Sequence, residues 1–142
     1  MAGSGALLLL EPIYGFYRTT DEWVLRKQAE MLANAGVDVV FNDNTNGALT
    51  WKSAYHALFE NWIKASEDGV KVPKISFLLP FGDNSGSQSQ LRSLYNDIYK
   101  DGVYQQLWYY LDDKPMLMAY SGSMPSEIRK FFTFRSGQAA YL

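Results

Sequence analysis

Two kinds of hydrophobic pattern alternate along the chain. Short continuous runs rich in β-branched and aromatic residues predict buried strands. Hydrophobic residues spaced three and four positions apart predict amphipathic helices between these runs. Strands are expected at residues 37–41, 75–79 and 116–120, and helices after Thr19, after the turn at 42–47, over 91–99 and over 126–132. This alternation predicts right-handed crossovers and a parallel sheet, so the fold class is α/β with parallel β/α repeats.

Local signals predict where several elements begin and end. Thr19 followed by Glu22 forms a capping-box pattern for the first helix, and Gly36 provides a left-handed stop. Thr50 or Thr45 is expected to cap the second helix. The final segment, 133–142, is interpreted as a loop or tail.

The chain of 142 residues has room for one ordinary domain. Residues 1–10 are interpreted as a leader or a first strand at Leu7–Leu10, and residues 11–142 as the domain. Three clear parallel strands are too few to close an eight-stranded barrel. Two architectures therefore remain open: a small open sheet, or about half of a TIM-like barrel.

Composition excludes several classes of function. The net charge of −2, without a basic segment, argues against nucleic-acid binding. No hydrophobic run is long enough for a membrane span, and the chain has no cysteine for thiolate chemistry. The abundant aromatic residues, 8 Phe, 10 Tyr and 4 Trp, suit either a binding surface or helix–sheet packing.

The most informative stretch is VDVVFNDNTNG, from Val37 to Gly47, where a strand runs directly into a polar turn. Ligands of parallel α/β folds bind at the carboxyl ends of the strands. Asp43 is therefore the candidate catalytic residue, and the amides of Asn42, Asn44 and Asn46 are candidate substrate-binding groups. The alternative is that these side chains only satisfy backbone groups of a tight turn.

Further candidates lie near other predicted strand ends. Asp83 follows the second strand, although its Gly/Ser/Asn-rich surroundings also suit a solvated loop. Aromatic faces for stacking on a sugar ring are offered by Trp51, Tyr14, Tyr17 and Tyr120. The other tryptophans, Trp23, Trp62 and Trp108, are predicted to pack. Arg18 suits an acidic substrate, or alternatively an ion pair with Asp21 or Glu22.

Metal and cofactor sites are not predicted. His56 is the single histidine and is expected to be structural, since no cysteine or second histidine accompanies it. The spacing of Asn42, Asn44 and Asn46 resembles the start of a calcium loop, but Ser53 stands where the bidentate glutamate belongs. No phosphate-binding glycine motif is present.

The assembled segments resemble (β/α)8-barrel glycoside hydrolases of the kind typified by families 71 and 99, and related bacterial polysaccharide-degrading barrel proteins. The resemblance rests on EPIYGFYRTTDEWVLRKQAEMLANAGVDVVFNDNTNG (Glu11–Gly47), VPKISFLLPF (Val72–Phe81), LYNDIYKDGVYQQLWYYLDDKPMLM (Leu94–Met118) and IRKFFTFR (Ile128–Arg135). It implies a barrel fold, a carbohydrate substrate, hydrolysis of glycosidic bonds, no cofactor and a secreted or periplasmic location.

The resemblance also implies a first strand before IYGFYR and further strands with acidic residues after FFTFR, so the chain looks like an amino-terminal fragment. Asn44 stands where that pattern leads us to expect an apolar residue. Two further hypotheses are a sugar-binding or vestigial module without catalysis, and an α/β domain unrelated to sugars. A half-barrel with an open sheet edge is expected to self-associate.

Overall fold

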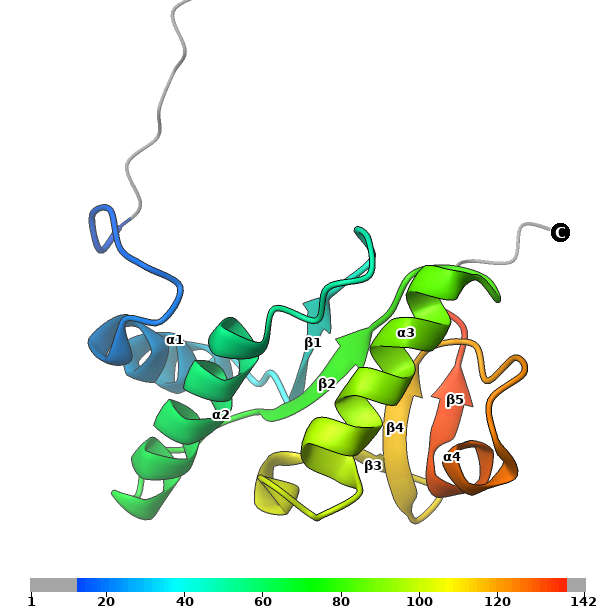
Figure 1. The fold of residues 1–142 in the computed structure, drawn as a ribbon. Coiled ribbons are helices and arrows are strands. Elements are labelled where there is room, and N and C mark those ends of the chain that lie inside the picture. The colour runs from blue at the N-terminus through cyan, green and yellow to red at the C-terminus, as the bar shows by residue number, and fades with distance from the viewer. Residues whose placement is uncertain (1–12, 138–142) are drawn as a thin grey trace, which may run out of the picture.

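A computed structural model describes residues 13–137, which form an α/β fold around a parallel sheet (Figure 1). The candidate strand at Leu7–Leu10 lies outside the described residues. The helices are α1 (Glu22–Asn34), α2 (Lys52–Glu67), α3 (Ser85–Leu94), which continues into a π-helical turn η1 (Tyr95–Tyr99), the 3-10 turn η2 (Gln105–Leu107), and α4 (Ser126–Phe131). The strands are β1 (Val39–Asp43), β2 (Lys74–Leu78), β3 (Tyr110–Leu111), β4 (Lys114–Met118) and β5 (Thr133–Arg135).

The strands β1, β2, β4 and β5 are parallel neighbours in that order, which confirms the predicted parallel sheet. Val40 pairs with Ile75, and Leu78 pairs with Met118. The short strand β3 pairs antiparallel with the start of β4, through a turn in which Asp112 and Asp113 both adopt positive φ. The carboxyl ends of β1, β2, β4 and β5 therefore lie along one edge of the sheet (Figure 1).

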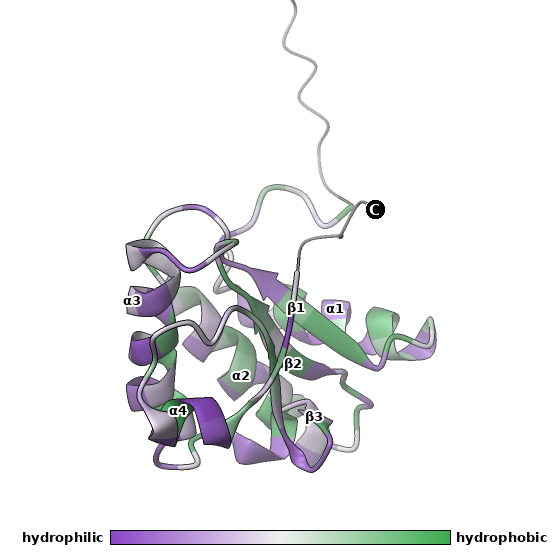
Figure 2. Ribbon diagram, turned by 90° about the vertical axis from the view of Figure 1, so that its right-hand side faces the viewer, coloured by the Kyte–Doolittle hydropathy of each residue, from purple (hydrophilic) through white to green (hydrophobic). Residues whose placement is uncertain are grey.

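The core lies between the sheet and its helices. Ile75 and Phe77 in β2, and Leu79 directly after it, alternate along the chain and are fully or almost fully buried. The Phe77 ring lies 5.5 Å from the Tyr55 ring and 6.3 Å from the Phe59 ring, both on α2. Figure 2 shows α3 and α4 together on one side of the sheet, and β1 hydrophobic except at its hydrophilic carboxyl end. Burial of these faces fixes the strands and leaves their polar ends at the surface.

Two helix starts differ from the sequence predictions. Asp21, not Thr19, caps α1, because Asp21 directly precedes the helix in an extended conformation and its carboxylate accepts the Val24 N–H at 3.0 Å. Neither Thr45 nor Thr50 caps α2; the N-cap is Trp51, which makes no side-chain capping bond.

Two further predictions were wrong. Residues 133–135, expected in a loop or tail, form β5, because their backbone pairs with β4 in parallel. Trp23, expected to pack, is 57% exposed, although its ring contacts Tyr14 edge-on. The predicted stop at Gly36 is confirmed by its φ of +86° just after α1. Within residues 13–137, no helix has the length and hydrophobicity needed to span a membrane.

Candidate functional site

A pocket of about 340 Å³ lies at the carboxyl end of β1, between α1 and the first turns of α2. Its walls combine polar groups from the strand end with apolar groups from the two helices. The lining residues are Thr19, Leu25, Gln28, Asn42, Asp43, Asn44, Thr50, Trp51, Ala54, Tyr55 and Leu58. We call this hollow the β1 pocket. It brings together four of the predicted site residues: Asn42, Asp43, Asn44 and Trp51.

Asp43 ends β1, and its side chain is exposed at the pocket. Its Oδ1 accepts the backbone N–H of Thr45 at 3.0 Å. Hydrogen bonds from the Thr45 side chain and then from its backbone lower the pKa of Asp43 below the ordinary value. The carboxylate is therefore ionised at neutral pH. The turn interaction predicted as an alternative is present, and the same carboxylate also lines the pocket.

The three asparagines occupy different environments. The Nδ2 of Asn42 is buried and has no hydrogen-bond partner among the described residues. Asn44 is buried and structural: its side chain donates to the Thr50 carbonyl at 3.2 Å. Its backbone N–H donates to the Leu78 carbonyl at 2.9 Å. Asn46 is exposed and lies outside the pocket lining. Asn42 is thus the asparagine of the pocket lining whose side-chain nitrogen has no hydrogen-bond partner among the described residues.

Trp51 presents an aromatic surface at the rim of the β1 pocket. Its side chain is 59% exposed, and its backbone adopts φ 57° and ψ 51°, in the left-handed region. That conformation costs a residue with a Cβ roughly 1–2 kcal/mol. The neighbouring Thr50 is buried, and the Trp51 carbonyl accepts the N–H groups of Ala54 and Tyr55 at the start of α2, so both sides hold this strained conformation.

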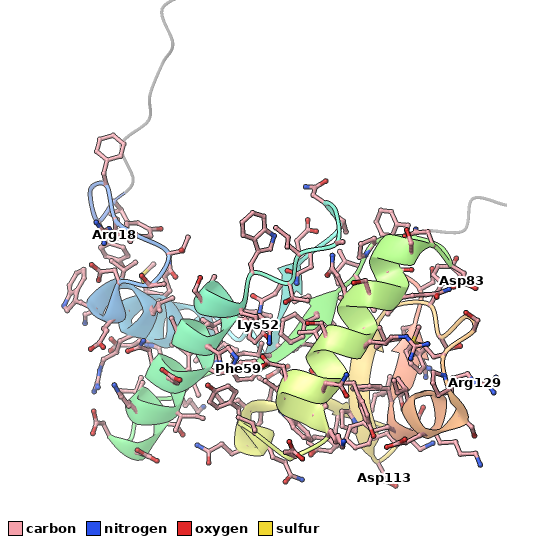
Figure 3. The ribbon with its side chains drawn as sticks, viewed as in Figure 1. Arg18, Lys52, Phe59, Asp83, Asp113 and Arg129 are labelled. Atoms are coloured by element: carbon pink, nitrogen blue, oxygen red, sulfur yellow. The ribbon has the colours of Figure 1, made fainter. Side chains whose placement is uncertain are left out.

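The polar turn after β2 lies beside the loop after β1, and the two line a second hollow of about 770 Å³. Asp83 accepts the Gln88 Nε2 at 2.6 Å and lies against Gly122, which follows β4. Asp83 does not line the β1 pocket. In Figure 3, Arg18 and Asp83 lie toward opposite ends of the molecule. Arg18 and Asp83 therefore do not line the β1 pocket, and their part in substrate binding stays a prediction.

The remaining predicted residues flank the site or lie apart from it. The Tyr17 hydroxyl accepts the Nε2 of Gln28, a pocket residue, at 3.1 Å. Arg18 is exposed; the alternative ion pair with Asp21 or Glu22 is not among those formed within residues 13–137. Tyr120 lines a different hollow of about 230 Å³, between the ends of β4 and β5.

A polar cluster between α2 and η1 was missed from the sequence. Asp97 accepts hydrogen bonds from Lys52 at 2.8 Å, from the Tyr55 hydroxyl, and from His56 Nε2 at 2.7 Å. Partial burial acts to raise the pKa of Asp97, but these three bonds outweigh it and lower the pKa to about 2. His56 Nδ1 lies 2.6 Å from the Tyr104 hydroxyl.

The cluster fits a structural role for His56, as predicted, because its bonds join α2 to η1 and to Tyr104. One signal was present in the sequence: side chains spaced as residues 52, 55 and 56 lie on one face of a helix. The identity of their partner was hidden, because the π-helical turn changes which side chains of 95–99 face α2.

No group of three or more His, Cys, Asp or Glu side chains within residues 13–137 is arranged to hold a metal ion. The β1 pocket contains one ionised carboxylate, amides, hydroxyls and an indole, a donor set suited to a ligand with many hydroxyl groups. Searches against protein-family models, curated protein sequences and solved structures found no match for this chain.

Proposed function

We propose that the chain binds a carbohydrate in the β1 pocket, as part of a (β/α)-barrel protein of the glycoside hydrolase type. The observation that carries the proposal is a pocket lined both by Asn42, whose buried Nδ2 has no hydrogen-bond partner within residues 13–137, and by the ionised carboxylate of Asp43. A buried donor without a partner is costly, and a ligand acceptor would satisfy it. A sugar hydroxyl both accepts and donates, so adjacent hydroxyls would engage Asn42 and Asp43 together.

Trp51 supports the same ligand class. Its exposed indole stands at the rim of a pocket with polar groups, as expected where a sugar ring packs its C–H face on an aromatic plane. Backbone strain is concentrated at binding and active sites more often than elsewhere. The left-handed conformation of Trp51 is an outlier of this kind.

The sheet order supports the barrel part of the proposal. In a (β/α) barrel, consecutive parallel strands are neighbours and the substrate binds at their carboxyl ends. The described strands β1, β2, β4 and β5 follow that order, and the β1 pocket lies at that end. Two adjacent β/α loops carrying polar groups, after β1 and β2, fit the same arrangement.

A second candidate function is sugar binding without hydrolysis. Glycoside hydrolysis generally uses two carboxyl groups, separated by about 5–5.5 Å or about 6.5–9.5 Å according to stereochemistry. Among the described residues, Asp43 is the one carboxylate that lines the β1 pocket. That observation favours binding over hydrolysis for residues 13–137.

The test is calorimetric titration of the chain with soluble gluco- and manno-oligosaccharides, with reducing-end release measured in parallel. We expect saturable binding that is weakened roughly tenfold in Trp51→Ala, since stacking contributes on the order of 1 kcal/mol. Trp23→Ala, which removes another exposed tryptophan away from the pocket, serves as the matched control and should leave affinity unchanged.

Binding accompanied by release of reducing ends supports hydrolysis, and binding without release supports the second candidate. Absence of binding to every neutral saccharide tested, with the chain folded, contradicts the proposal.

A further inference from the structure

The loop after β1, which contributes to the β1 pocket, forms hydrogen bonds with the side chain of Gln90 on α3. Gln90 is fully buried, and its Nε2 donates to the carbonyl of Asn44 at 2.8 Å and to the carbonyl of Gly47 at 2.7 Å. These two carbonyls bracket the turn after Asp43. Gln90 belongs to a different helix, more than forty residues along the chain.

The hydrogen bonds of Gln90 use only half of its amide. Both donor bonds reach the loop, whereas the Oε1 is buried with no hydrogen-bond partner among the described residues. An unpartnered buried acceptor costs about 1–3 kcal/mol. The contribution of this amide therefore comes from its N–H donors, because without them the carbonyls of Asn44 and Gly47 would lose their hydrogen bonds to Gln90.

A chain of contacts connects Gln90 to the carboxylate in the pocket. Fixing the carbonyls of Asn44 and Gly47 fixes the intervening backbone, including the N–H of Thr45. That N–H is the donor to Asp43 Oδ1. One turn before Gln90 on the same helix, Gly86 also approaches the Gly47 carbonyl, so closely that an added Cβ would lie 3.3 Å from its oxygen.

We infer that Gln90 is a positioning residue, which sets the orientation of the Asp43 carboxylate in the β1 pocket by holding the turn between Asn44 and Gly47. The inference rests on the proposed function only for its consequence on ligand binding. The positioning itself is a property of the unliganded protein.

The test uses Gln90→Met, which keeps the side-chain length and removes both donors. Gln88→Met is the matched control: it lies on the same helix, but its amide donates to Asp83 at the other strand end. In Gln90→Met we expect the Asp43 carboxyl, followed by NMR, to titrate at higher pH than in the unchanged protein. We also expect Thr45 amide exchange to quicken roughly tenfold, as for the loss of one hydrogen bond. Gln88→Met should change neither.

A purely structural role would lower the free energy of unfolding without moving either signal, and that result would overturn the inference. If Gln90→Met does not fold, Gln90→Asn keeps a buried amide but is one methylene too short to reach both carbonyls, so the same two shifts are expected. Unchanged signals in a folded Gln90→Asn would likewise overturn the inference. Because both readouts are taken without sugar, a failure of the proposed function is distinguishable from a failure of the inference.

Discussion

The polar turns after β1 and β2 occupy equivalent places, at the carboxyl ends of adjacent parallel strands, yet they do different things. After β1, Asp43 lines a pocket between α1 and α2, and Gln90 of α3 forms hydrogen bonds with the loop that contains Asn44 and Gly47. After β2, Asp83 is engaged by Gln88 of its own loop and helix and lies against Gly122. Both carboxylates are exposed, but the first lines the β1 pocket, whereas the second lies against the loop after β4.

The comparison shows that a polar residue at the carboxyl end of a parallel strand does not by itself form a pocket. What distinguishes the two turns is the surrounding packing. Residues of α1 and α2 together line a hollow at the end of β1, whereas the loop after β4 lies close beside the exposed carboxylate of Asp83. The same residue type therefore lines a pocket in one turn and lies against a neighbouring loop in the other.

The largest predicted effect is on stability and concerns Gly122, which lies beside the turn after β2. A Cβ added to Gly122 would lie 2.2 Å from Asp83 Oδ1 and 2.4 Å from Asp83 Cγ, and φ at Gly122 is +46°. Gly122→Ala should therefore lower the free energy of unfolding by about 2 kcal/mol, from backbone strain and the displaced Asp83–Gln88 bond together. Urea denaturation measures this change.

Gly82→Ala is the control, because its φ is +79° but nothing lies within 4 Å of the added Cβ. It should cost only the strain, about 1 kcal/mol. In the background of Asp83→Ala, the cost of Gly122→Ala should fall to that of Gly82→Ala. Equal costs for the two glycine variants in the unchanged background would show that Asp83 is not packed against Gly122.

The second prediction separates the two carboxylates by function. Asp43→Asn and Asp83→Asn each keep an oxygen that accepts the existing loop hydrogen bond, so both should fold with little loss of stability. Only Asp43→Asn should weaken oligosaccharide binding, by roughly tenfold, the usual effect of losing one hydrogen bond to a charged group. Calorimetric titration of the two variants side by side measures it. Equal weakening in both variants would remove the functional distinction between the turns.

The smallest predicted effect is on the titration of Asp43. Hydrogen bonds from Thr45 lower the pKa of Asp43, so Thr45→Val, which removes the hydroxyl and keeps the backbone N–H, should move its pKa partway back toward the ordinary value. A depressed folded-state pKa stabilises the protein above the unfolded pKa of about 3.9, and this contribution is lost as pH falls through the folded value. NMR titration of the Asp43 side chain should therefore show a higher midpoint in the variant; an unchanged midpoint would exclude the hydroxyl as a cause.

Much of the fold was predictable from the sequence, because hydrophobic spacing reflects burial directly. The strands at Val39–Asp43, Lys74–Leu78 and Lys114–Met118 and the helices between them follow that pattern. β5 was missed because only three residues pair, and their pattern is not distinct from that of a tail. The caps were misjudged because both candidate threonines for α2 lie before Trp51, whose left-handed conformation no local rule favours.

The site was predictable only in part. Asp43 was a candidate because it follows a predicted strand of a parallel sheet. The neighbouring asparagines were candidates because they lie next to it in the sequence. Their separate roles did not follow, since burial of Asn44 and exposure of Asn46 depend on how the loop folds over α3. Gln90 was missed because a single glutamine within a polar helix start has no sequence signal, and its contact with the loop spans 43 residues.

The most direct test of the central claim is NMR mapping of oligosaccharide binding on the unchanged protein, with backbone and side-chain amide signals assigned. We predict that the saccharide shifts the signals of residues 42–45, the Asn42 side-chain amide and the Trp51 indole, and leaves those of residues 82–86 in place. Shifts confined to the turn after β2, or no shifts at saturating saccharide, would contradict the assignment of the β1 pocket as a carbohydrate site.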